Sequence, residues 1–99
     1  MALMQIAVVP LGTNSTSASD YVADFQKILA ASNLSFTLTD MATIVEGDTT
    51  ELLAIAAKIH EIPYGKGVQR VLTTLSIDDR RDKNVHLGDK VKSVQDKLS

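Results

Sequence analysis

The order in which the hydrophobic period changes along the chain constrains its fold more than any other feature. Alternating or β-branched apolar runs indicate strands, whereas apolar residues spaced three and four apart indicate helices. The order is strand, helix, strand, strand, helix, strand, and then one further helix. Strands are predicted at Met4–Leu11, Leu34–Thr39, Ala42–Glu46 and Arg70–Ile77, and helices from Ser17 or Ser19 to about Ser32, at about Thr49–Glu61 and at Leu87–Leu98.

This order is typical of the split βαβ, or ferredoxin-like, fold. In that α+β fold, a four-stranded antiparallel sheet carries both main helices on one face. The last predicted helix, which has a narrow apolar stripe, is an addition to the motif. The length of 99 residues fits one domain, spanning residues 1–99.

The other face of the predicted sheet receives no helix from the main motif. Small and hydroxyl-bearing residues dominate it: Gln5, Ala7, Thr37, Thr39, Thr74 and Ser76. Four residues are predicted to form an apolar patch there: Ala7, Val9, Val45 and Leu72. Antiparallel sheets commonly expose one face to solvent. We favour packing of this face on another subunit or on the last helix, because an apolar patch of this kind marks an interaction surface.

Composition excludes several classes of function. The chain has no cysteine, so disulfides, thiolate metal sites and cysteine nucleophiles are excluded. The net charge of −2 is spread along the chain and gives no basic stripe for nucleic acid. The apolar runs are too short to span a membrane and the start lacks a signal-peptide pattern, so a cytoplasmic protein is expected. His60 and His86 lack metal-ligand spacing, and neither a metal nor another cofactor is predicted.

The segment Met41–Asp48 runs a predicted strand into a predicted helix and carries two acidic residues. Asp48 and Glu51 have the spacing of a capping box, which explains both without any chemistry. Capping does not explain Glu46 at the end of the strand. Glu46 is either a solvated acid or an acceptor that faces a ligand.

The charged segment Asp78–Lys83 also has two interpretations. Its residues form internal ion pairs on an ordinary loop, or Arg80 and Arg81 bind an anion or a partner carboxylate bidentately. His60 and Glu61 are predicted to serve the end of the second main helix. No set of acid, base and nucleophile emerges, so no catalysis is predicted.

Five segments, through their order and spacing, give a match to a known family over nearly the whole chain: Val9–Thr13, Met41–Asp48, His60–Glu61, Arg70–Arg80 and Asp82–Lys83. With these segments the chain resembles the thiamine-binding protein family, formerly called UPF0045. The resemblance implies a ferredoxin-like fold, dimers that pair into a homotetramer, and binding of thiamine or its hydroxymethylpyrimidine part without established catalysis. One departure is Ala42, which stands where the family usually has glycine and lacks glycine's positive-φ freedom.

The chemistry of the implied ligand selects candidate binding residues. Thiamine joins an aminopyrimidine to a cationic thiazolium, so a site needs an apolar slot, hydrogen-bonding groups and preferably negative charge. Phe36 or Tyr21 is predicted to supply the slot, Thr39, Thr43 and Ser17 the hydrogen bonds, and Glu46 the acceptor for the pyrimidine. We expect a carrier, buffer or sensor of the vitamin. The alternatives are a regulatory or scaffolding module without a vitamin ligand and an enzyme of thiamine salvage, which the missing catalytic set disfavours.

Overall fold

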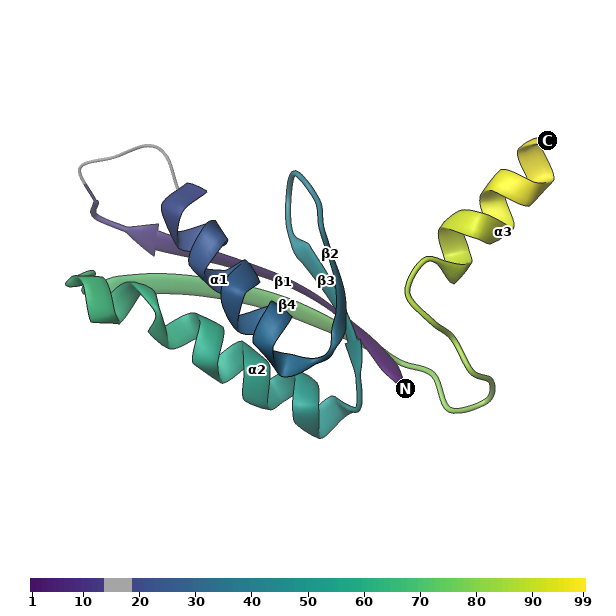
Figure 1. The fold of residues 1–99 in the computed structure, drawn as a ribbon, viewed down its shortest axis with the longest axis horizontal. Helices are drawn as coiled ribbons and strands as arrows, with labels where there is room; N and C mark the ends of the chain where they lie inside the picture. The colour runs from purple at the N-terminus through teal and green to yellow at the C-terminus, as the bar shows by residue number, and fades with distance from the viewer. Residues whose placement is uncertain (14–18) are drawn as a thin grey trace.

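The computed structural model describes residues 1–13 and 19–99, and it has the predicted α+β, ferredoxin-like fold (Figure 1). The described elements are β1 (Ala2–Leu11), α1 (Ser19–Ser32), β2 (Ser35–Leu38), β3 (Thr43–Gly47), α2 (Thr49–Glu61), the short 3₁₀-helix η1 (Pro63–Lys66), β4 (Arg70–Asp79) and α3 (Asp89–Leu98). The four strands form one antiparallel sheet in the order β2-β3-β1-β4. Helices α1 and α2 cover one face of this sheet, and we call the other face the open face (Figure 1).

The pairing register decides which side chains of the sheet face the helices. Strand β1 pairs with β4 along its whole length, from Ala2 opposite Asp79 to Leu11 opposite Arg70. It pairs with β3 only from Ala2 to Ile6. Because side chains alternate along a strand, the even-numbered residues of β1 from Ala2 to Val8 enter the core.

The register corrects one prediction about the open face. Val45 lies opposite Met4, is fully buried, and therefore belongs to the core rather than to the open face. Its neighbour Ile44 lies opposite Gln5 on the open face instead. Both β3 residues are apolar, so the hydrophobic pattern could not set the phase of this strand.

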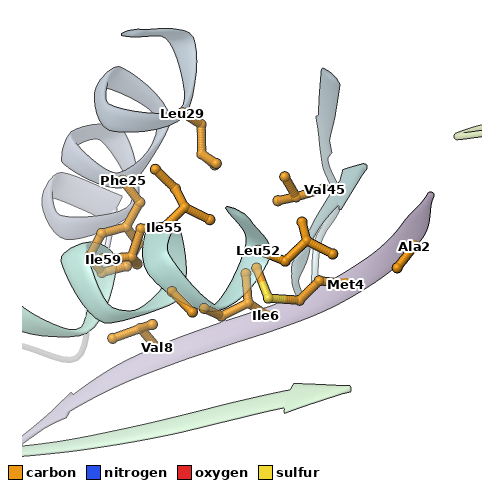
Figure 2. Close-up of a cluster of buried hydrophobic side chains, with 11 residues drawn as sticks. Ala2, Met4, Ile6, Val8, Phe25, Leu29, Val45, Leu52, Ile55 and Ile59 are labelled. Carbon is orange, nitrogen blue, oxygen red and sulfur yellow. The ribbon is translucent and has the colours of Figure 1, made fainter. Parts of the chain in front are cut away.

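The core lies between the sheet and the two main helices, as Figure 2 shows. Its helical members follow the predicted spacing: Phe25 and Leu29 on α1, and Leu52, Ile55, Ala56 and Ile59 on α2. Gly47, the last residue of β3, lies close to the side chain of Leu34. An ideal Cβ at Gly47 would lie 3.2 Å from Leu34 Cδ2. A side chain at this position would force the neighbouring leucine to move.

Helix α2 begins at the predicted capping box, in which the Asp48 N–H donates to Glu51 Oε1 at 3.3 Å. At the other end of α2, the sequence predicted that His60 serves the helix terminus. Instead, His60 Nδ1 lies 2.7 Å from Thr73 Oγ1, so this side chain ties α2 to β4.

Helix α3 projects away from the sheet and from α1 and α2 (Figure 1). None of its residues is buried, and its apolar stripe is exposed at Val91, Val94 and Leu98. In the described part of the chain, no helix is long and apolar enough to cross a membrane.

The Leu52→Ala variant tests the importance of this core. Leu52 is fully buried, so its truncation leaves a cavity and is expected to lower the free energy of unfolding by about 2–5 kcal/mol in urea denaturation. The neighbouring Leu53 is 50% exposed, and Leu53→Ala is expected to cost about 0.5 kcal/mol or less. Equal losses for both variants at one protein concentration would contradict this account of the core.

Candidate functional site

A cavity of about 570 Å³, which we call the apolar pocket, opens between α1 and the end of the β2–β3 hairpin. It lies where β1 continues past its last pairing with β3, at Ile6 opposite Thr43. The β1 backbone beyond Ile6 therefore has an edge here without a strand partner among the described residues. The lining is mainly apolar and includes Val8, Val22, Phe25, Leu38, Met41 and Ala42.

A pair of hydrogen-bonded side chains supplies the polar part of this pocket. Gln26 Nε2 on α1 donates to Thr43 Oγ1 on β3 at 3.2 Å, and Thr43 is only 7% exposed. This bond leaves the Gln26 amide oxygen as an acceptor and the Thr43 hydroxyl as a donor. Together they can bind a flat heterocycle that presents one donor and one acceptor side by side.

Thr39 and Asp40 complete the polar rim at the hairpin turn. The Thr39 hydroxyl donates to the Ala42 carbonyl at 2.7 Å and accepts from the Ala42 N–H at 3.2 Å, which closes the turn. Asp40 is exposed and also lines the pocket. Its carboxylate adds negative charge to the lining of this mainly apolar cavity.

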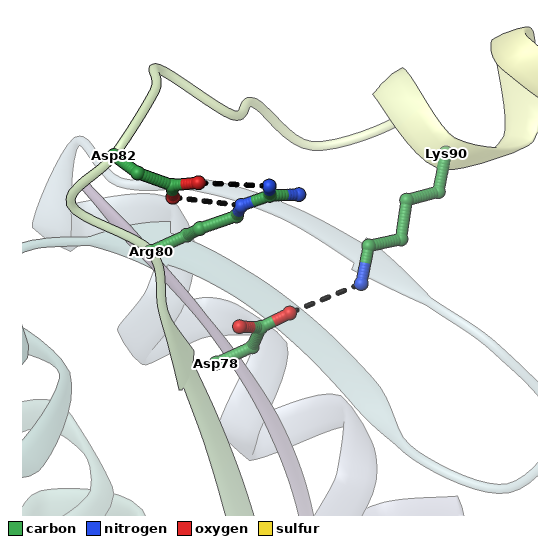
Figure 3. A network of polar contacts seen from close by, with 4 residues as sticks. All are labelled: Asp78, Arg80, Asp82 and Lys90. Carbon is green, nitrogen blue, oxygen red and sulfur yellow. Dashed lines mark hydrogen bonds and ion pairs between the residues drawn. The ribbon is translucent and has the colours of Figure 1, made fainter.

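Glu46 lies on the open face, away from the apolar pocket. Its Oε1 accepts the Leu87 N–H at 2.8 Å and lies 3.1 Å from His86 Nδ1. Beside it, Asp78 Oδ2 binds Lys90 Nζ at 3.0 Å (Figure 3), and Val85 is buried in the same segment. We call these contacts the Glu46–Asp78 clasp, because they hold residues 85–90 and hence the start of α3 against the sheet.

The predicted ligand residues are therefore divided by the structure. Thr39 and Thr43 meet in the apolar pocket, while Phe36 is partly buried against the core. Tyr21 lines a different cavity, and Ser17 lies outside the described residues. A ligand role for Glu46 stays a prediction for the opposite face of the sheet.

Gln26 is a site residue that no motif in the sequence marks. It stands four residues after Val22, so helical spacing alone puts it at the edge of the apolar stripe of α1. Its partner Thr43 could not be predicted, because the contact depends on how α1 crosses the sheet. A polar residue at that edge was the signal available in the sequence.

The charged loop after β4 shows the internal ion pairing that the sequence offered as one alternative. Arg80 binds Asp82 through two bonds of 2.8 and 2.9 Å (Figure 3), and Arg81 Nη2 binds Asp79 at 2.8 Å. The hydrogen bond from Arg81 lowers the pKa of the Asp79 carboxyl, and the bond from Arg80 does the same for Asp82. Both guanidinium groups are thus engaged within the loop, and an anion site at these arginines stays untested.

Residues 1–13 and 19–99 contain no group of three or more side chains suited to hold a metal ion.

This chain is similar to known proteins over nearly its whole length. A family model described as thiamine-binding protein matches residues 4–95. The UPF0045 protein YqgV of Bacillus subtilis is 44% identical over 102 residues, which cover 99% of this chain and 98% of that protein. A UPF0045 protein of Methanothermobacter thermautotrophicus is 42% identical over 99 residues, which cover 99% of this chain and all of that protein, 100%.

Two solved structures are also similar. The crystal structure of protein MJ1052 from Methanocaldococcus jannaschii has a TM-score of 0.86 and 29% identity, with 95% of each chain covered. A Thermotoga maritima protein, provisionally described as a thiamine biosynthesis or salvage protein, has a TM-score of 0.77 and 16% identity, with 94% of this chain and 97% of that chain covered. The second likeness supports the fold alone.

The Glu46→Ala variant tests the Glu46–Asp78 clasp. Loss of the carboxylate removes a charge-assisted acceptor worth about 1.5–3 kcal/mol, so the Leu87 amide is expected to exchange its hydrogen about ten- to one-hundred-fold faster. Hydrogen exchange followed by nuclear magnetic resonance measures this directly. Glu61→Ala, at the exposed end of α2, is the matched control, and unchanged exchange at Leu87 in Glu46→Ala would refute the clasp.

Proposed function

Because this chain belongs to the thiamine-binding protein family, we propose that it binds thiamine or its hydroxymethylpyrimidine part in the apolar pocket without transforming it. The observation that carries the proposal is the Gln26–Thr43 pair at the polar side of that pocket. The protein then acts as a carrier, buffer or sensor of the vitamin in the cytoplasm.

The pocket suits the two rings of this ligand in size and chemistry. Its volume of about 570 Å³ falls within the range of small-molecule sites. The apolar walls offer contact to the aminopyrimidine, whose amine can donate to the Gln26 amide oxygen while a ring nitrogen accepts from the Thr43 hydroxyl. The Asp40 carboxylate in the lining favours the cationic thiazolium, and the free β1 edge offers further backbone hydrogen bonds.

We also propose that the protein works as a homotetramer, built as a dimer of dimers. The open face exposes Val9 and Leu72 at 44% and 56%, and the apolar stripe of α3 is more exposed still. A helix of 10 residues is only marginally stable in water unless it packs against a partner. Each copy of the chain has an exposed open face and an exposed apolar stripe on α3. In an oligomer, the α3 stripe of one copy can therefore cover the open face of another.

The same exposed surfaces favour a second candidate, an assembly or regulatory module without a vitamin ligand. In that case the open face and α3 carry the function, and the apolar pocket has no specific occupant. The two candidates differ in whether the folded oligomer responds to the vitamin.

Titration calorimetry with thiamine and with hydroxymethylpyrimidine tests the binding site. Loss of one hydrogen bond in Thr43→Val or in Gln26→Leu is expected to weaken binding about two- to twelve-fold. Thr37→Val is the matched control, because Thr37 is exposed on the opposite face of the sheet. The affinity of this variant for both ligands should equal that of the wild type.

Two outcomes would overturn this assignment. Absence of binding and of any thermal shift with both ligands, in a protein that remains oligomeric, would favour the scaffold. A loss of affinity in Glu46→Gln but not in Thr43→Val would move the ligand to the open face.

Sedimentation velocity tests the proposed assembly. A charge on the apolar stripe in Val94→Glu is expected to shift the protein from tetramer to smaller species, because the buried carboxylate would lack a partner. Ser93→Glu adds the same charge on another side of α3 and should leave the assembly intact. A wild-type protein that is only monomeric at micromolar concentration would contradict the proposal.

A further inference from the structure

A second cavity, of about 550 Å³, lies where β1 ends and β4 begins, and it shares no lining residue with the apolar pocket. We call it the basic pocket. Its described walls come from the end of β1, the first turn of α1 and residues 66–70, which run from the last residue of η1 to the first residue of β4. They include Gly12, Tyr21, Lys66, Gly67, Gln69 and Arg70.

The charge of the lining is entirely positive. Lys66 and Arg70 are the ionised residues of the described lining, and none of the described lining residues is acidic. Arg70 is the cation of this lining that forms no ion pair with a described residue, whereas Lys66 pairs with Asp24 and also lies within the field of Asp20. Two cations that face one cavity favour an anion of high charge density.

Lys66 is held in place at the edge of this cavity. Its ammonium lies 5.2 Å from the centre of the Tyr21 ring and forms an ion pair with Asp24. The Lys66 ammonium donates a hydrogen bond to the Asp24 carboxylate, and this bond raises the pKa of Lys66. Asp24 lies outside the lining and pairs with Lys66 from the side of α1.

Arg70 is available for a ligand. Unlike Arg80 and Arg81, whose guanidinium groups bind Asp82 and Asp79, Arg70 makes no ion pair with any residue in the described part of the chain. Its five N–H donors in a planar fork match two oxygens of an oxyanion.

Glycine backbone leaves the space in front of these cations open. Gly12 and Gly67 have φ values of 74° and 88°, the left-handed region that glycine occupies without strain. Among the described residues, apart from the glycine and its chain neighbours, no heavy atom lies within 4 Å of an ideal Cβ at either position. The turns at Gly12 and Gly67 therefore form walls without side chains that would fill the cavity.

We propose that the basic pocket binds a phosphate group. Arg70 binds two phosphate oxygens, Lys66 neutralises the second charge, and the Tyr21 hydroxyl and Gln69 amide supply neutral donors. A phosphate dianion uses two cations and several donors at once, whereas a carboxylate uses one fork. The group is inorganic phosphate or the phosphate of an ester such as thiamine monophosphate, and the site does not depend on vitamin binding in the apolar pocket.

Titration of the intact protein with inorganic phosphate, at low ionic strength and fixed pH, tests the site by calorimetry. Arg70→Gln is expected to weaken phosphate binding at least about tenfold, and Lys66→Gln is expected to weaken it as well. Asp24→Asn is expected to strengthen it, because removal of the competing carboxylate frees the Lys66 ammonium. Arg81→Gln and Lys97→Gln, which remove cations elsewhere, should have no comparable effect.

Thiamine monophosphate separates the two sources of the phosphate. If an ester is the ligand, thiamine monophosphate binds the basic pocket more tightly than inorganic phosphate does, and Arg70→Gln removes that advantage while thiamine affinity in the apolar pocket stays unchanged. Equal affinity for the ester and for inorganic phosphate assigns the pocket to the free anion. The proposal is wrong if wild type fails to bind both phosphates at millimolar concentration, or if Arg70→Gln binds them as wild type does.

Discussion

The pairing of β1 with both of its neighbours is the constraint on which the rest of the structure depends. β1 is a central strand that pairs with β4 along ten residues and with β3 along five, so its register fixes the register of both. Its even-numbered residues then build the core with α1 and α2, and its odd-numbered residues build the open face. A slip of one residue would exchange the two faces completely.

The unequal pairing of β1 also creates the apolar pocket. The pairing of β1 with β4 extends to Leu11, whereas its pairing with β3 ends at Ile6. The β2–β3 hairpin turn lies beyond this last pair and does not pair with β1. The space left beside the free β1 edge is bounded by α1 on the core side. The apolar pocket thus follows from the difference in length between the pairings of β1 with its two neighbours rather than from a special loop.

Much of this architecture is predictable from sequence because it rests on local periodicity. The order of elements, the α2 cap at Asp48 and the ion pairs of the loop after β4 all depend on residues a few positions apart. The phase of β3 is not predictable, because Ile44 and Val45 are both apolar. The Gln26–Thr43 contact and the clasp of Glu46 with Leu87 join residues 17 and 41 positions apart, and only tertiary packing brings these together.

Three residues of the segment Met41–Asp48 make contacts with three different parts of the fold. Thr43 and Glu46 are three residues apart on one strand, so their side chains emerge on opposite faces and cannot serve one pocket within a single chain. Thr43 faces α1 beside Gln26, Glu46 holds the start of α3, and Asp48 begins α2. The clasp fixes where α3 leaves the sheet and so limits the ways in which its apolar stripe can reach a second copy. Under the proposed function, one five-residue strand therefore connects the vitamin site on one face with the assembly surface on the other.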